Sequence, residues 1–255
     1  MRRSWPAVLL AALVLALTLP SLRRPAPELQ QLTALTGPGA EQAADHASYL
    51  AVERAAGQAS AVRTPDPGVD RTGWPVIVAF GDSLTAGHGV EPDRNYPSQL
   101  QALLDELGYR YRVVNAGVSG EMTAGGLSRV GTVLEHGPEI VILELGANDG
   151  MQAVPPDEVR ANLAAIVEQL QAAGATVVLA GMRAPPNYGS EYEAAFARIY
   201  PDLAEAYGLP LIPFFLEGVA GSPYLNQRDG IHPTAEGYAI VVINVLETLE
   251  PLLRR

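Results

Sequence analysis

A short segment between two glycines carries a serine that is well placed for nucleophilic chemistry. Residues 81–87 read GDSLTAG and directly follow an apolar run, residues 76–80. The flanking glycines allow a tight turn, which exposes Ser83 at the start of a helix. A serine hydroxyl attacks an acyl carbonyl when a neighbouring base takes its proton. Serine is also a favoured helix N-cap, and Asp82 could serve as a cap as well. This segment alone therefore does not decide whether Ser83 is a nucleophile or a helix cap.

A histidine near the C-terminus could be the base that such a serine needs. Residues 229–234 read DGIHPT. The carboxylate of Asp229 can orient the imidazole of His232, so that the other ring nitrogen is free to accept a proton from a serine. The plain alternative is a surface histidine in a loop before a helix. His88 has no such acidic partner in the sequence, and we assign it to loop surface or to the rim of a pocket.

Two further segments offer hydrogen-bond donors. Residues 115–120 read NAGVSG, and residues 146–150 read GANDG. Both are ordinary turn sequences. A glycine N–H and an asparagine amide that converge on one point would also stabilise the oxygen that becomes negative during acyl transfer. Neither segment alone decides between a turn and such an oxyanion site.

The elements that must position these segments follow from the hydrophobic pattern. Five short apolar runs predict strands, and the stretches after them have helical spacing. The expected strands are residues 76–80, 111–114, 140–145, 176–180 and 211–215, and the expected helices are residues 96–107, 123–135, 157–173, 191–207 and 234–253. Apolar strands that alternate with crossover helices predict a doubly wound α/β fold with a parallel sheet covered on both faces.

In such a sheet, ligands bind beyond the carboxyl ends of the strands. The segments with Ser83 and with the two sets of donors each follow an expected strand, so we expect them at one edge of the sheet. The Gly-x-Ser-x-Gly elbow of the α/β-hydrolases is absent from the sequence, which argues against that fold. Glu144 is an unusual charge inside an apolar run, and pairing with an arginine would explain it.

The four segments occur in the order and at the strand ends found in the SGNH, or GDSL, hydrolase family, which this chain resembles. The resemblance implies a flavodoxin-like, three-layer fold with five parallel strands. It implies that Ser83, Asp229 and His232 form a catalytic triad. It also implies an oxyanion hole made of the backbone N–H groups of Ser83 and Gly120 and the side chain of Asn148.

Within that family the chain is most similar to the group of acyl-CoA thioesterase I, lysophospholipase L1 and arylesterase. The similarity covers roughly residues 75–253 and includes the segments ELGANDG, PNYG, IYP and LIPFF. Two positions depart from the usual pattern of the group, because Ala147 stands where glycine is usual and Glu121 where aspartate is usual. Glycine at the first of these positions would leave the backbone beside Asn148 more freedom, so Ala147 puts that backbone in question.

The resemblance implies a serine esterase or thioesterase that hydrolyses acyl esters, acyl thioesters or lysophospholipids through an acyl-serine intermediate. No cofactor and no metal are expected, because only Asp229 and His232 are adjacent ligand types. Two alternatives remain open, a carbohydrate O-deacetylase of the same fold and a non-catalytic binding module. For substrate contacts we consider residues of the loops after the fourth strand and near the histidine, namely Met182, Pro185, Tyr188 and Ile231.

Composition and the N-terminus limit the partners and the location of the protein. A formal net charge of -11 disfavours binding to nucleic acid, and the lack of cysteine excludes disulfides and thiolate metal sites. Residues 1–24 predict a signal peptide or an uncleaved signal anchor, residues 25–73 a linker rich in Pro, Ala and Gly, and residues 74–255 the hydrolase domain. We therefore expect an exported protein, periplasmic or extracellular, or one anchored to the cytoplasmic membrane by residues 5–22.

Overall fold

The computed structural model describes residues 65–255. The segment predicted to be a signal peptide or anchor, residues 1–24, lies outside the described residues, as do residues 25–64 of the predicted linker. Among the helices of the described part, none is both long and apolar enough to cross a membrane.

The end of the predicted linker contacts the folded part. Residues 65–75 contain turns and no helix or strand. The guanidinium of Arg71 nevertheless donates to the Oδ2 atom of Asp105 at 2.5 Å, and both side chains are largely buried. Contacts of the folded part therefore begin before Gly73.

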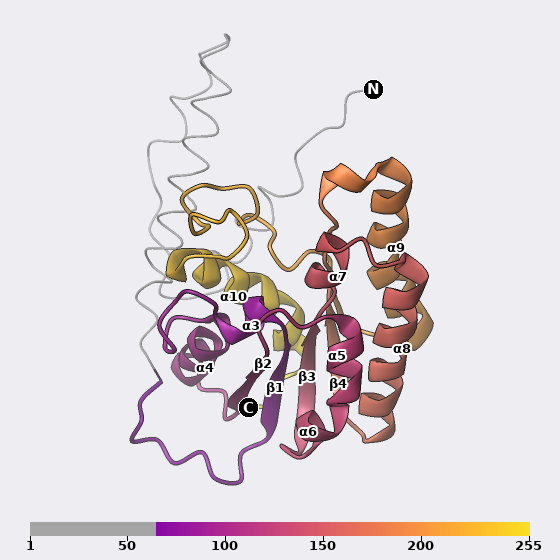
Figure 1. The fold of residues 1–255 in the computed structure, drawn as a ribbon. Helices are drawn as coiled ribbons and strands as arrows, with labels where there is room; N and C mark the ends of the chain where they lie inside the picture. The colour runs from indigo at the N-terminus through magenta and orange to yellow at the C-terminus, as the bar shows by residue number, and fades with distance from the viewer. Residues whose placement is uncertain (1–64) are drawn as a thin grey trace, which may run out of the picture. The chain divides into compact units, whose positions relative to one another are not determined.

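A five-stranded parallel sheet forms the centre of the folded part that the structure describes (Figure 1), and it confirms the predicted fold class. The strand order is β2-β1-β3-β4-β5, which is the flavodoxin-like order. All six residues of β1 are buried, because this strand lies between two neighbours and is covered on both faces. The strands are β1 (Val76–Gly81), β2 (Arg112–Gly117), β3 (Pro138–Glu144), β4 (Thr176–Ala180) and β5 (Leu211–Ile212).

Helices cover both faces of the sheet, which gives the predicted three layers (Figure 1). One face carries α4 (Tyr96–Glu106) and α10 (Ala235–Leu249), which pack against each other. The other face carries α5 (Thr123–Ser128), α6 (Val130–Leu134), α8 (Pro156–Ala172) and α9 (Ser190–Tyr207). Two short helices, α3 (Ser83–Ala86) and α7 (Ala147–Met151), lie where β1 and β3 end.

One expected helix is in fact two. The sequence predicted a continuous helix over residues 123–135, but α5 ends at Ser128 and α6 begins at Val130. Arg129 between them has φ -116° and ψ 15°, outside helical geometry. Gly125, Gly126 and Gly131 give this stretch a low intrinsic helix propensity, which makes the break inexpensive.

Prolines shorten two other predicted elements. The expected strand over residues 211–215 is regular only at Leu211–Ile212, because Pro213 has no N–H to donate to a sheet. The expected last helix over residues 234–253 is helical at Ala235–Leu249 and then continues as a 3₁₀ turn, Glu250–Leu252, around Pro251.

Candidate active site

The serine of the glycine-flanked segment lies at the carboxyl end of β1, an inner strand of the sheet. Asp82 is the N-cap of α3, since its Oδ1 atom accepts a hydrogen bond from the backbone N of Leu84 at 2.9 Å. Ser83 is therefore not the cap but the first residue of the helix, with its hydroxyl free to act elsewhere. Gly81 is required before this turn, because a Cβ atom there would lie 2.2 Å from the Thr85 hydroxyl oxygen.

Three predicted residues are joined by hydrogen bonds. The Oγ atom of Ser83 lies 2.9 Å from Nε2 of His232. The Nδ1 atom of His232 lies 2.7 Å from Oδ2 of Asp229. With Nδ1–H donated to the carboxylate, Nε2 is the unprotonated nitrogen and can accept the serine proton.

The loop that carries Asp229 and His232 is fixed by its own backbone. Gln227 N donates to His232 O at 2.7 Å, and Thr234 N donates to Leu225 O at 2.8 Å, so the two ends of the loop are paired. Thr234 then caps α10 by accepting from Gly237 N. The sequence DGIHPT thus places its histidine at a fixed distance from the start of the last helix.

Hydrogen bonds hold the aspartate in its charged form. The Oδ1 atom of Asp229 accepts from the backbone N atoms of Ile231 at 2.9 Å and His232 at 3.0 Å. The bond from Ile231, followed by that from the imidazole, lowers the pKa of Asp229 well below its usual range. The carboxylate therefore stays negative and can stabilise a positive charge on the imidazole.

The predicted backbone donors point to no other protein group. Gly120 lies in the loop after β2 with φ +80°, an exposed left-handed position suited to glycine. Within residues 65–255, the N–H of Gly120 donates to no protein acceptor. The N–H of Ser83 opens a helix and has no acceptor within it. Both donors are available to a bound oxygen.

Asn148 connects the serine turn with the Gly120 loop. Its Nδ2 atom donates to Oδ2 of Asp82 at 2.9 Å and to the backbone O of Glu121 at 3.0 Å. The predicted oxyanion donor thus lies beside the two other donor segments, but both of its N–H groups already have acceptors. The substitution Ala147 raises no difficulty, since this residue starts α7, and the left-handed conformation belongs to Gly146 with φ 115°.

An arginine that the sequence analysis did not single out fixes the loop after β2. The Nε atom of Arg129 lies 2.7 and 2.8 Å from the two carboxylate oxygens of Glu121. Its NH2 atom also donates to the backbone O atoms of Gly81 and Ala116, and its guanidinium lies over the ring of Phe80. Arg129 thus ties the loop of Gly120 to the ends of β1 and β2. In the sequence, Glu121, the acidic residue after Gly120, could have indicated that a cation lies nearby.

Two buried carboxyl groups lie beneath the serine turn. Asp82 and Glu144 are both fully buried. Burial raises the pKa of Asp82 to about 6 and raises the pKa of Glu144 well above its usual range. The predicted pairing of Glu144 with an arginine is wrong, since Glu144 forms no ion pair within the described part of the chain. Its partners are Asp82 and Thr85 instead.

The residues considered for substrate contacts differ in exposure. Met182 is a core residue, only 4% exposed, which leaves it little surface to offer a ligand. Pro185 is half-buried, while Tyr188 and Ile231 are exposed. The hydroxyl of Tyr188 donates to the backbone O of Met151 at 2.5 Å, which ties its loop to α7. Contact of Pro185, Tyr188 and Ile231 with substrate stays a prediction.

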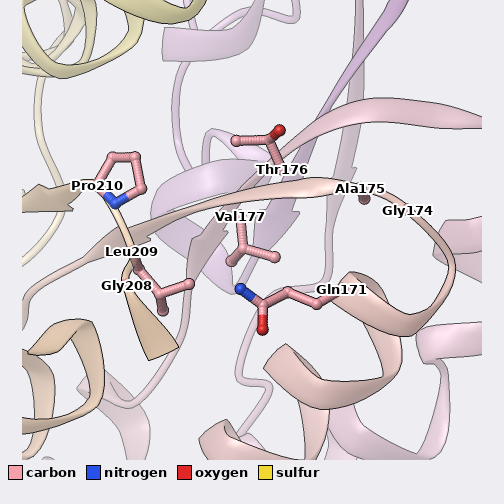
Figure 2. Close-up of a pocket in the computed structure, with 8 residues that line it drawn as sticks. All are labelled: Gln171, Gly174, Ala175, Thr176, Val177, Gly208, Leu209 and Pro210. Atoms are coloured by element: carbon pink, nitrogen blue, oxygen red, sulfur yellow. The ribbon is translucent and has the colours of Figure 1, made fainter. Parts of the chain in front are cut away.

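A separate hollow lies at the opposite end of the sheet (Figure 2). Its volume is about 320 Å³, and it lies beside the amino ends of β4 and β5. Gln171, Val177 and Leu209 are among its lining residues. No residue predicted for catalysis reaches it, so it is not the site described above.

Comparison with known proteins supports this reading of the fold. The sequence profile of the GDSL-like lipase/acylhydrolase family matches residues 79–240. Esterase TesA of Pseudomonas aeruginosa is 43% identical over 178 residues, which are 69% of this chain and 89% of that protein. Thioesterase 1/protease 1/lysophospholipase L1 of Escherichia coli is 36% identical over 178 residues, which are 69% of this chain and 84% of that protein.

A solved structure agrees with these relatives. The crystal structure of AlinE4, an SGNH-hydrolase family esterase, superimposes with a TM-score of 0.60 at 45% identity. The match covers 71% of this chain and 98% of that chain. The family profile, which matches residues 79–240, includes all the strand ends that carry the site. By its sequence profile, its relatives and its fold, the chain belongs to the GDSL-like lipase/acylhydrolase family of hydrolases.

Proposed function

We propose that Ser83 is the nucleophile, His232 the general base and Asp229 the orienting residue in the hydrolysis of acyl esters and thioesters. The observation that carries the proposal is the unbroken hydrogen-bond chain from Asp229 through His232 to Ser83. Each member has the neighbour that its role requires, and no bound metal is needed for the proton transfers.

The reaction has two steps. In the first, Oγ of Ser83 bonds to the acyl carbon while Nε2 of His232 takes its proton and then passes it to the leaving alcohol or thiol. In the second, water attacks the acyl-serine, Nε2 takes the water proton and returns it to Oγ, and the acid leaves. The ionised Asp229 stabilises the imidazolium in both steps.

The oxyanion of each tetrahedral intermediate is held by the N–H groups of Ser83 and Gly120 and by the amide of Asn148. An oxyanion is a stronger acceptor than a neutral carbonyl, so it displaces the backbone O of Glu121 from one N–H of Asn148. The other N–H stays on Asp82, which keeps the amide oriented. These donors act on charge that appears only in the transition state, so they raise turnover more than affinity.

The substrate class follows from the relatives and from the exposed loops. The names of the relatives include esterase, thioesterase and lysophospholipase. Tyr188 and Ile231 are 38% and 44% exposed, and apolar side chains of this kind suit an acyl chain. We assign an acyl ester, acyl thioester or lysophospholipid as substrate, with Pro185, Tyr188 and Ile231 as acyl contacts.

The same proposal includes the location of the protein. Arg2 and Arg3 precede an uncharged apolar run over residues 5–22, the pattern of an export signal. We assign the chain to the periplasm or the extracellular space, either released after cleavage or anchored to the cytoplasmic membrane by residues 5–22. Fractionation of expressing cells, with mass determination of the mature N-terminus, tests this point.

A substrate profile tests the function. Purified protein is assayed on p-nitrophenyl esters of increasing chain length, on acyl-CoA and on lysophospholipids, alongside Ser83→Ala and after treatment with EDTA. We expect hydrolysis that survives EDTA and is abolished in Ser83→Ala. Activity confined to acetylated sugars would replace the proposal with an O-deacetylase. Lack of labelling by a fluorophosphonate would indicate a binding module.

A further inference from the structure

Glu144 is a buried acid that the mechanism above does not use. It is the last residue of β3, and its side chain lies under the turn that carries Ser83. Its Oε2 atom accepts from the hydroxyl of Thr85 at 2.7 Å and from the backbone N of Asp82 at 3.3 Å. Asp82 and Thr85 lie on either side of the nucleophile in sequence. One carboxyl oxygen therefore holds both flanks of the Ser83 turn.

No positive charge in the described part compensates Glu144. Arg129 is the cation beside the strand ends, and its guanidinium is used by Glu121 and by two backbone carbonyls. The neighbouring ionisable group is another acid, Asp82. Its carboxylate accepts hydrogen bonds from Leu84 and Asn148, and it is also fully buried. Two adjacent buried negative charges without a cation would be very costly.

The second oxygen of Glu144 and the hydroxyls of two neighbouring tyrosines are buried. Within the described residues, Oε1 of Glu144 and the hydroxyl oxygens of Tyr96 and Tyr238 are buried without a hydrogen-bond partner. Burial, followed by the neighbouring Glu144, raises the pKa of both tyrosines. A protonated carboxyl group is a donor as well as an acceptor, so it is compatible with neutral hydroxyls on this side.

We propose that Glu144 is a positioning residue that acts as a neutral carboxylic acid, with its carbonyl oxygen holding the Ser83 turn. The inference rests on the proposed function. A neutral group has a specific advantage here, because the oxyanion forms above Ser83 and a carboxylate directly below it would oppose that charge. Of the two acids joined beneath the Ser83 turn, Asp82, bonded to Asn148, is then the one that carries the negative charge.

Two substitutions separate neutrality from packing. Glu144→Gln keeps a neutral carbonyl acceptor of nearly the same shape, so we expect kcat and KM within a few-fold of those of the unmodified protein. Glu144→Leu removes the acceptor and leaves the Asp82 N–H and the Thr85 hydroxyl unpaired. We expect it to lower kcat by about 10²-fold through misplacement of Ser83, with little change in KM. Glu247→Gln, at an exposed position of α10, is the matched control.

Two readouts are independent of activity. Infrared difference spectra between the unmodified protein and Glu144→Gln at pH 7 should contain the carbonyl band of a protonated carboxylic acid. The melting temperature, compared across pH 5 to 9, should fall for the unmodified protein relative to Glu144→Gln as pH rises. The reason is that the folded state keeps a proton that the unfolded chain loses above the ordinary glutamate pKa of 4.5. Titration of Asp82, Tyr96 and Tyr238 is common to both proteins and largely cancels.

The outcomes distinguish this inference from the proposed function. A carboxylate band in place of the acid band, or a Glu144→Gln variant as impaired as Glu144→Leu, would overturn the role of Glu144. If Glu144→Leu fails to fold, the Glu144→Gln variant and the infrared spectra still test the role of Glu144. If instead the proposed function is wrong, the unmodified protein will neither hydrolyse acyl substrates nor react with fluorophosphonate.

Discussion

The imidazole rings of His88 and His232 lie in contact, with centroids 4.5 Å apart and planes tilted by 43°. The backbone O of His88 also accepts from Nε2 of Gln227, which belongs to the loop of His232. One residue of the loop after α3 therefore contacts the proposed base through its ring and the loop of that base through its backbone.

This contact predicts a positioning effect on the base. His88→Ala removes the ring that limits rotation of His232, and we expect kcat to fall by up to about tenfold, the scale of one aromatic contact. His88→Phe should restore most of the activity. The measurement is steady-state kinetics, with exposed His136→Ala as control. Equal loss in the Ala and Phe variants would show that the imidazole chemistry, and not the ring contact, is what matters.

A second prediction concerns the oxyanion donor. Asn148→Ala should fold normally and lower kcat by about 10²–10³-fold, because one donor to the transition-state charge is lost. KM should change far less, since the ground-state carbonyl carries little charge. The assay is hydrolysis of a p-nitrophenyl ester. Asn162→Ala, which removes another amide that bonds Thr123, serves as comparison. Unchanged turnover in Asn148→Ala would place this residue outside the site.

A third prediction tests the ion pair that fixes the Gly120 loop. Arg129→Met leaves Glu121 without its partner and frees the loop from the backbone O atoms of Gly81 and Ala116. We expect a loss of up to about 10²-fold in kcat from misplaced donors. Arg198→Met, which breaks an exposed pair with Asp202, should have no such effect. If an Arg129 variant has normal kcat but lower stability, Arg129 contributes to the stability of the fold and not to the position of the oxyanion donors.

A fourth prediction uses the raised pKa of Asp82. Its pKa is about 6, so Asp82 takes up a proton as pH falls through 6 and not near 4. Asn148 then loses its charged acceptor, so the proposed oxyanion donor is held less firmly in place. We therefore expect kcat/KM to decrease as pH falls through about 6. Asp229 stays ionised here, because its pKa is lowered.

Rates measured from pH 4.5 to 8, with circular dichroism to verify folding at each point, supply the test of this fourth prediction. A kcat/KM that stays constant as pH falls through 6 would mean that protonation of Asp82 leaves the site unaffected.

A fifth prediction concerns the start of the folded part. A fragment of residues 65–255 should be folded and active, because it contains every element of the sheet and the proposed site. A fragment of residues 74–255 lacks Arg71 and its bond to Asp105, and its melting temperature should be lower by about 2–4 °C. Asp105→Asn in the longer fragment should reproduce most of that decrease. Equal stability of all three would show that Arg71 contributes nothing.

The strand-end positions of the site could be predicted because they depend on local sequence. The apolar runs before Ser83 and Asn148 predict strands even though Glu144 interrupts the second, and glycines mark the turns that follow. The spacing of Asp229 and His232 is also local, so their contact needed no knowledge of the rest of the chain.

Other features depend on contacts between distant segments. Glu144 could be recognised as unusual, but its neutral state follows from the absence of a cation around it in the folded chain. The ring contact of His88 with His232 joins residues from opposite ends of the domain. The break between α5 and α6 lies at Arg129, whose guanidinium reaches the ends of two strands. The helical periodicity of the sequence does not indicate this contact.

The glycines at the strand ends limit how this protein can change. A Cβ atom at Gly81 would lie 2.2 Å from the Thr85 hydroxyl oxygen, and one at Gly117 would lie 2.2 Å from the backbone N of Ala86. Even a methyl group therefore disturbs the Ser83 turn. We expect no residue other than glycine to be tolerated at Gly81 and Gly117. If the proposed function holds, adaptation to a new acyl group is left to the loops that carry Pro185, Tyr188 and Ile231, so a mutant library aimed at altered specificity should be concentrated there.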